Sequence, residues 1–181
     1  MNDGLAWETL SSEVAYTCEG FDVITETVRL PDDTETEFDY LTEGESVVIV
    51  PLTPDGDVVV IEEWRQAVKR VNYGLPAGSV EPGDDELRTA VARELQEETG
   101  YQPGDVTHLT TVEPANGFSD AVFHYFLVED CTPTGERDLD YNESIQVATT
   151  TVESLREAAR EDELRDGRTM LGVLYYATFE R

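Results

Sequence analysis

Alternating apolar and polar residues mark the first part of the chain. The alternation covers residues 13–17, 21–30 and 36–41, and the sequence Pro-Asp-Asp at 31–33 separates the last two segments. A period of two places successive side chains on opposite faces of a strand, and Pro and Asp favour turns. The pattern predicts short strands that form an antiparallel sheet over residues 1–44.

Two longer apolar runs follow this segment. Residues 46–52 and 58–64 have the length of strands, and Thr-Pro-Asp-Gly-Asp at 53–57 connects them. Pro and Gly in such a connection favour a tight hairpin turn. We therefore expect a hairpin at the start of a main domain over residues 45–181, with residues 1–44 as an N-terminal β extension.

A helical period replaces the strand period at residues 84–99. Apolar residues there recur at helical spacing, acids stand at the start and Gly100 follows the end, which predicts a helix. The remaining pattern predicts strands at 106–112, 121–129 and 144–151 and helices at 152–164 and 169–179. This order of elements favours a layered α/β or α+β domain.

The composition is strongly acidic. The 181 residues carry 40 acidic and 12 basic side chains, for a formal charge of −28. This charge repels phosphate backbones and anionic lipids, so we expect neither nucleic acid nor a membrane as a partner. Lys69 is the single lysine, and acidic excess with few lysines is typical of adaptation to a salt-rich cytoplasm. A phosphate-binding protein of this charge needs local arginines or metal ions.

Other classes of protein are disfavoured. The apolar runs are far shorter than the roughly 18 residues of a membrane helix, and the first residues lack the basic and apolar regions of a signal peptide. Cys18 and Cys131 lie far apart and in no metal-ligand spacing, so neither a disulfide framework nor a structural zinc site is expected. We expect a cytoplasmic protein.

Three glutamates of the predicted helix carry the chemistry. Glu94, Glu97 and Glu98 are three and four residues apart, so their carboxylates lie on one helix face. Such oxygen ligands suit Mg²⁺ or Mn²⁺, which bridge to substrate phosphates and activate water. Arg93 is expected to pair with a neighbouring carboxylate and fix its rotamer. The competing interpretation is that a protein this acidic places acids on one face by chance.

The segment around these glutamates, residues 78–101, reads GSVEPGDDELRTAVARELQEETGY. It resembles the Nudix box, and its second half, from Arg93 to Tyr101, matches the box throughout. In the first half, Asp85 stands where the box has Glu, and six residues instead of five separate it from Gly78. Since Asp84 and Glu86 are also acidic, the acidic position is either shifted by one residue or relaxed.

The resemblance implies a fold and a set of ligands. The fold is a Nudix α/β/α sandwich with a mixed sheet and an N-terminal antiparallel β extension. The implied metal ligands are the carboxylates of Glu94, Glu97 and Glu98 and the backbone carbonyl of Ala77. Mg²⁺ or Mn²⁺ is the implied cofactor, and Glu94, Glu97 and Arg93 are implied to serve catalysis.

The sequence before the box reads Leu-Pro-Ala-Gly at 75–78. It matches the corresponding segment of the ADP-ribose diphosphatase branch of that family, to which most of the chain is similar, although Gly74 stands where the branch usually has Glu. The pair Trp64-Arg65 resembles an aromatic-arginine pair whose arginine contacts phosphate or ribose, which makes Arg65 the candidate phosphate clamp. Its alternative role is a surface salt bridge. Gly78 is implied to bind substrate.

The branch also suggests substrate contacts outside the box. The loop Gly-Phe-Ser-Asp at 117–120 resembles a substrate loop, with Asn116 in place of a common proline, and implies that Phe118 and Ser119 bind substrate. The N-terminal sheet resembles the part that builds a swapped homodimer and supplies aromatic residues that stack the adenine. The candidates for stacking are Phe21, Phe38 and Tyr40, for which core packing is the alternative role.

The general base is expected in a late loop. The branch places an acid there, and this chain has Asp140-Tyr141-Asn142-Glu143. Glu143 aligns best with an acid, while Tyr141 stands where a related enzyme often has Glu and is a poor base near neutral pH. The base is therefore Glu143, Asp140 or a glutamate of the box.

The sequence thus predicts metal-dependent hydrolysis of a nucleoside diphosphate linked to another group. ADP-ribose, cleaved to AMP and ribose 5-phosphate, is the expected substrate, and a homodimer is the expected assembly. One alternative is a Nudix hydrolase of another nucleotide sugar or a dinucleotide. Another is a nucleotide-sensing module that retains the fold without turnover, which the altered first half of the box favours and the intact second half opposes.

Overall fold

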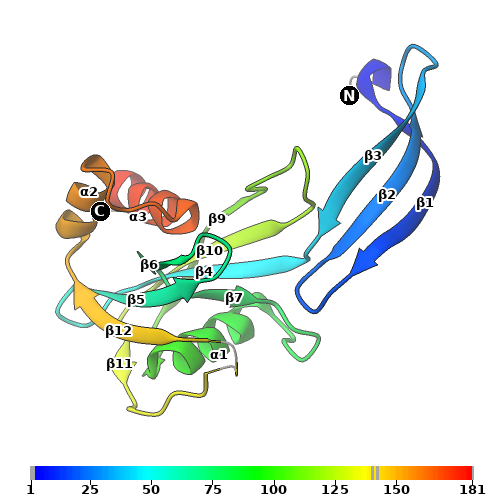
Figure 1. Ribbon diagram of the computed structural model, residues 1–181. Helices are drawn as coiled ribbons and strands as arrows, with labels where there is room; N and C mark the ends of the chain where they lie inside the picture. The colour runs from blue at the N-terminus through cyan, green and yellow to red at the C-terminus, as the bar shows by residue number, and fades with distance from the viewer. Residues whose placement is uncertain (1–2, 140, 142, 181) are drawn as a thin grey trace. The chain divides into compact units, whose positions relative to one another are not determined.

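The computed structural model describes residues 3–139, 141 and 143–180 (Figure 1). The chain forms two compact units. The first unit comprises Met1–Glu45 and Glu113–Val122, and the second comprises Ser46–Val112 and Phe123–Arg181. Residues 113–122 thus belong to the first unit although they come from the middle of the chain.

The first unit is built on the expected antiparallel sheet. After a short 3-10 helix at Asp3–Leu5, the strands β1 (Glu8–Thr17), β2 (Asp22–Arg29) and β3 (Glu35–Thr42) pair in the order β1-β2-β3. The N–H of Leu30 donates to the carbonyl of Thr34 at 2.8 Å, so the turn lies where Pro and Asp predict it. Every residue of β1 is exposed.

The second unit contains most of the remaining elements. Three sheets have the strand orders β7-β4-β10-β9, β12-β5-β6 and β11-β8. The strands are β4 (Glu45–Pro51), β5 (Val58–Arg65), β6 (Arg70–Gly74), β7 (Ala77–Ser79), β8 (Tyr101–Gln102), β9 (Val106–Val112), β10 (Val122–Val128), β11 (Thr132–Pro133) and β12 (Ile145–Thr150). The helices are α1 (Leu87–Thr99), α2 (Val152–Arg160) and α3 (Gly167–Phe179).

The prediction that β4 and β5 pair with each other as a hairpin is wrong. The turn itself forms, because the N–H of Gly56 donates to the carbonyl of Thr53 at 2.8 Å. Beyond an isolated bridge between Leu52 and Val58, however, the strands belong to different sheets. β5 pairs instead with β12 and β6. A turn fixes where the chain reverses, whereas sheet partners depend on contacts distant in sequence.

The core explains the continuous apolar run of β4. Val48 and Val50 pack in a cluster with residues of α2 and α3, whereas Val47 and Ile49 pack with residues of α1. Side chains of a strand alternate between its faces, so a strand covered on both faces is apolar throughout. The second unit is therefore a sandwich with α1 on one side of its sheets and α2 and α3 on the other (Figure 1).

Helix α1 begins later than predicted and ends at the predicted residue. The helix begins at Leu87, so the acids at 84–86 precede it instead of forming its first turn, and Glu86 makes no side-chain capping bond. The helix ends as predicted, at Thr99. Gly100 follows as the C-cap with a φ of 72°, a left-handed conformation that glycine adopts without strain. Among the described residues, no helix is long and apolar enough to cross a membrane.

Candidate active site

Helix α1 carries buried carboxylates on one face. Glu94 and Glu98 are 8% and 2% exposed, and Glu97, next to them on the helix, is partly exposed. Leu95 anchors the helix in the core. Because residues three and four apart on a helix are neighbours, the three acids lie together at the edge between core and solvent.

Arg93 joins these acids to the preceding segment. Its Nη1 donates to Glu94 at 2.8 Å and to Glu97 at 3.0 Å. Its Nη2 donates to Asp84 at 2.9 Å and to the backbone carbonyl of Ser79 at 2.8 Å. A guanidinium carries five N–H donors in a fixed plane, so a single side chain sets the position of several carboxylates. The expected pairing of Arg93 with a neighbouring carboxylate is present.

Of the acids in the first half of the box, Asp84 is the one that accepts hydrogen bonds from Arg93. The side chain of Asp84 is 3% exposed, and it also accepts from the N–H of Glu81 at 2.9 Å. The hydrogen bond from Arg93 lowers the pKa of Asp84, whereas Asp85 is exposed. Five residues separate Gly78 from Asp84, so the additional residue lies between Asp84 and Arg93.

Glu98 is the most deeply buried of the helix carboxylates. Its Oε2 accepts from the N–H of Ala77 at 3.0 Å. Burial raises the pKa of Glu98 to about 8, and the charges of Glu94, Glu143 and Glu63 act in the same direction. A buried carboxylate among other acids is unfavourable as an anion. Without a cation, Glu98 therefore holds a proton near neutral pH.

Gly78 makes room for Glu94. A Cβ atom at position 78 would clash with the Glu94 carboxylate, so a glycine lets the carboxylate lie directly against strand β7. Burial raises the pKa of Glu94 to about 7, although the ion pair with Arg93 opposes this shift. The glycine of the box and its first glutamate thus form one packed unit.

Strand β5 adds an acid that the sequence analysis missed. Glu63 is 7% exposed, and its Oε2 lies 2.6 Å from Nη2 of Arg65 in an ion pair that lacks hydrogen-bond alignment. Burial raises the pKa of Glu63, while the charges of Arg65 and Arg168 lower it. The signal was in the alternation of β5, because Glu63 follows Ile61 on the buried face.

The loop before β12 brings Glu143 toward these acids. After burial, the charge of Glu143 is among the causes that raise the pKa of Glu94 and of Glu98, so its carboxylate lies within electrostatic reach of both. Tyr141 is 85% exposed. Asp140, the alternative candidate for the base, lies outside the described residues.

The donor set fits a hard divalent cation. Glu94, Glu97 and Glu98 offer carboxylate oxygens, and a cation would relieve the unfavourable burial of two of these anions. Among the described residues, no three acid, His or Cys side chains are already arranged as a metal centre. In this arrangement Arg93 donates to one oxygen of Glu94 and to one oxygen of Glu97.

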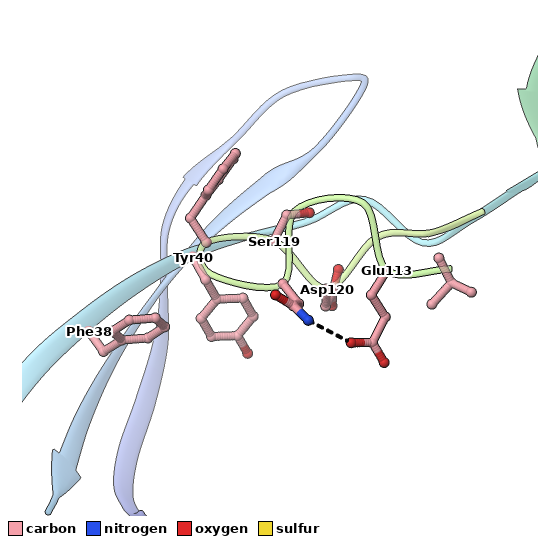
Figure 2. A pocket seen from close by; sticks show the side chains of 8 residues that line it. Phe38, Tyr40, Glu113, Ser119 and Asp120 are labelled. Carbon is pink, nitrogen blue, oxygen red and sulfur yellow. Dashed lines mark hydrogen bonds between the residues drawn. The ribbon is translucent and has the colours of Figure 1, made fainter. Parts of the chain in front are cut away.

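The first unit contains a separate set of candidate residues around a pocket of about 360 Å³ (Figure 2). Phe38 and Tyr40 lie side by side on β3, with their ring centroids 6.3 Å apart. Phe21 is not among the lining residues. The pocket is lined by Phe38, Tyr40, Glu113, Asn116, Phe118, Ser119, Asp120 and Val122.

Hydrogen bonds fix the loop that carries Phe118 and Ser119. The hydroxyl of Ser119 donates to Glu43 at 2.8 Å, and the carboxylate of Asp120 accepts from the hydroxyl of Thr42 at 2.6 Å. The carbonyl of Phe118 accepts from the N–H of Leu41 at 2.8 Å. The predicted substrate loop is therefore tied to β3, and Phe118 remains exposed at the pocket.

Comparisons with known proteins show which proteins the chain is similar to. The sequence model of the NUDIX domain matches residues 42–170. The chain is 28% identical to an ADP-ribose pyrophosphatase of Bacillus subtilis (strain 168), over 93% of this chain and 91% of that protein. It is 24% identical to a methanol dehydrogenase activator of Bacillus methanolicus, over the same shares of the two chains.

A solved structure has the same fold. The crystal structure of an ADP compounds hydrolase superposes with a TM-score of 0.83 at 19% sequence identity, over 94% of this chain and 92% of that chain. The similarity includes nearly the whole length of both chains, so the expected fold is confirmed.

Proposed function

We propose that this chain, which belongs to the NUDIX domain family and is a Nudix hydrolase, cleaves ADP-ribose to AMP and ribose 5-phosphate. The observation that carries the proposal is the buried pair Glu94 and Glu98, with Arg93 and Gly78 packed against Glu94. The similarity to an ADP-ribose pyrophosphatase over most of both chains supports the choice of substrate.

Mg²⁺ or Mn²⁺ is the proposed cofactor. Glu94, Glu97, Glu98 and the carbonyl of Ala77 would hold it. When bound, such an ion offsets the charge of a diphosphate and makes a bound water more acidic. The acidic surface makes this local positive charge necessary, because a chain with a formal charge of −28 repels a free diphosphate.

The side chains of the second unit prepare the site for this chemistry. Arg93 orients Glu94 and Glu97 through its Nη1 hydrogen bonds. The N–H of Ala77 fixes one oxygen of Glu98, so the other oxygen has a defined direction. Arg65 is the proposed phosphate clamp, since its guanidinium offers paired donors to phosphate oxygens. Its ion pair with Glu63 holds the guanidinium on the same face of β5.

We assign the role of general base to Glu143. A base must accept a proton from the attacking water, and a carboxylate near the α1 acids meets that need. The charge of Glu143 raises the pKa of Glu94 and of Glu98, which supports this assignment over a glutamate that is already hydrogen-bonded to Arg93. Replacing Glu143 with Gln is expected to lower kcat by about 100-fold without weakening the binding of Mn²⁺ to the same extent.

Phe118 and Ser119 are proposed to bind substrate in the pocket of the first unit. The neighbouring rings of Phe38 and Tyr40 offer an apolar surface for a planar base. Replacing Phe38 with Leu keeps an apolar side chain and removes the ring, so a higher KM for ADP-ribose with a similar kcat would support a stacking role.

We propose a homodimer as the assembly. β1 is an edge strand that is exposed along its whole length, and it exposes the apolar side chains of Leu10, Val14 and Tyr16. An exposed apolar edge favours association. Light scattering in high KCl should give twice the mass of one chain, and the variant Val14→Glu should shift the protein toward the monomer.

The test of function is a substrate panel in high KCl. The salt reflects a proposed salt-rich cytoplasm, which the formal charge of −28 and the single lysine suggest. ADP-ribose, nucleotide sugars and dinucleoside polyphosphates are compared with and without Mg²⁺. Metal-dependent cleavage of ADP-ribose above the others is expected. Preferred cleavage of another compound would reassign the substrate, and ligand binding without any turnover would favour a nucleotide-sensing module.

A further inference from the structure

Helix α3 contacts the segment that precedes the box. Thr169 is completely buried, and its Oγ1 accepts from the N–H of Leu75 at 2.9 Å. The same hydroxyl donates to Oδ2 of Asp166, the N-cap residue of α3, at 2.9 Å. A hydroxyl carries one proton and a carboxylate only accepts, so Asp166 orients the Thr169 hydroxyl with its lone pairs available to Leu75.

The segment at 75–78 is held from two sides. Thr169 fixes its start at the N–H of Leu75, and Glu98 of α1 accepts from the N–H of Ala77 at 3.0 Å. Between them, the carbonyl of Pro76 accepts from the N–H of Ile49 at 3.0 Å, and the ring of Pro76 restricts its φ angle. The orientation of the Ala77 carbonyl therefore depends on contacts from α3, β4 and α1 together.

Helix α3 and its N-cap residue lie very close to the backbone of Gly74. A Cβ atom at position 74 would clash with Oγ1 of Thr169 and would lie 3.2 Å from Oδ2 of Asp166. Any side chain at this position would thus displace the hydroxyl that binds Leu75. Gly74 is therefore the residue that the contact with Thr169 requires.

We propose that Thr169 is a positioning residue. Asp166 orients its hydroxyl, and through Leu75 this hydroxyl fixes the Ala77 carbonyl and the Glu98 carboxylate as cation ligands. This inference rests on the proposed function. Thr169 touches neither substrate nor metal and acts through Leu75. Groups that orient metal ligands in this way typically change metal affinity or activity by about 10–100-fold when removed.

The variants Thr169→Val and Thr169→Ser test the proposal. Val keeps the shape of Thr and removes the hydroxyl, whereas Ser keeps the hydroxyl. Binding of Mn²⁺ is followed without substrate through the electron paramagnetic resonance signal of the free ion, and kcat and KM for ADP-ribose are measured separately. Thr169→Val is expected to weaken Mn²⁺ binding and to lower kcat by about tenfold, with a smaller change in KM. Thr169→Ser is expected to keep Mn²⁺ binding and kcat near the wild-type values.

A double-mutant cycle tests the contact itself. Gly74→Ala should weaken Mn²⁺ binding in the wild-type background, because its methyl group displaces the Thr169 hydroxyl. In the Thr169→Ala background the same change should have little further effect, since the clashing atom is gone. Contacting residues show such non-additivity, whereas independent residues do not. Additive effects would contradict the proposed link between the two positions.

The outcomes separate this proposal from the proposed function. If the wild-type protein neither binds Mn²⁺ nor cleaves ADP-ribose, the proposed function fails. If the wild type does both and Thr169→Val matches Thr169→Ser, the positioning role is overturned. Should thermal unfolding show that Thr169→Val does not fold, Asp166→Ala decides, because it removes the carboxylate that orients the Thr169 hydroxyl and leaves Thr169 itself unchanged. Reduced Mn²⁺ affinity then supports the role, and unchanged affinity overturns it.

Discussion

Glu8 in the first unit and Glu98 of helix α1 have the same side chain and lie in opposite environments. Glu8 on β1 is 64% exposed as a side chain and pairs with Arg29 in solvent. Glu98 on α1 is 2% exposed and lies among other acids. The exposed acid adds to the net charge, whereas burial raises the pKa of Glu98 to about 8.

This difference teaches how chemistry can be found in a very acidic chain. Counting acids does not separate the surface of the protein from its site, because 40 acidic residues occur throughout the sequence. Burial does separate them, since water no longer stabilises the anion there. A cation at the α1 acids would recover that lost stabilisation, whereas a cation at an exposed acid gains little.

The largest expected effect is on turnover by Glu98→Gln. The amide keeps the size of the side chain but is a weaker ligand, so kcat for ADP-ribose should fall by about 1000-fold while the protein stays folded. Glu86→Gln is the matched control. Glu86 is exposed beside the same helix and makes no capping bond through its side chain, so its replacement should change kcat by less than about twofold.

Stopped-flow or coupled assays of both variants in Mg²⁺ and high KCl measure this difference. Turnover by Glu98→Gln at the wild-type rate would show that the buried acid is structural. A large loss in Glu86→Gln would remove the distinction between buried and exposed acids.

The next largest effect concerns Arg93. Arg93→Ala leaves the half-buried Asp84 and the buried Glu94 without their cationic partner. Breaking such half-buried ion pairs destabilises a protein by about 2 kcal/mol, between the effects for exposed and for buried pairs. Arg93→Lys keeps the charge with fewer donors and should cost less. Urea unfolding in EDTA measures both, and equal stability of the Ala variant and the wild type would contradict the role of Arg93 as the link between these acids.

Local patterns predicted the elements that carry the site. The helical period and Gly100 placed α1 and its end, and the spacing of Glu94, Glu97 and Glu98 placed their side chains on one face. These features depend on residues within one or two turns of each other. The predicted beginning of α1 was wrong because the side chain of Asp84 accepts hydrogen bonds from Arg93. The period of apolar residues does not describe such contacts.

The residues that sequence analysis missed are brought in by distant segments. Glu63 is buried on β5, where the charges of Arg168 from α3 and of Glu143 from the loop before β12 act on it. Thr169 contacts Leu75 across 94 positions of the sequence. The alternation along β5 showed that Glu63 shares the face of Ile61, but it did not show what covers that face. Such contacts depend on which elements pack together.

A smaller effect is expected when the pH of the metal-free protein is changed. The pKa of Glu98 is about 8 in the folded protein against an ordinary value of 4.5, so the folded state holds the proton more tightly than the unfolded state. The resulting stabilisation is fully present below the ordinary pKa and is lost as the pH rises through about 8.

Thermal unfolding in EDTA and high KCl should show this loss. Between pH 5 and pH 8.5 the Tm of the wild type is expected to fall about 5 °C further than that of Glu98→Gln, which has no proton to lose. Mn²⁺ should reduce the pH dependence of the wild type. Parallel curves for the two proteins would mean that Glu98 does not carry the effect.

The smallest effect is expected for Glu8→Gln in the first unit. Glu8 lies 2.6 Å from Arg29, but both side chains are solvated, and salt screens an exposed ion pair. The lost attraction is offset by the lower repulsion in a chain of charge −28. In high KCl the Tm should change by less than about 1 °C. Calorimetry of this variant beside Glu98→Gln completes the comparison, because a shift as large as the one from the buried acid would show that exposure does not distinguish the two kinds of acid.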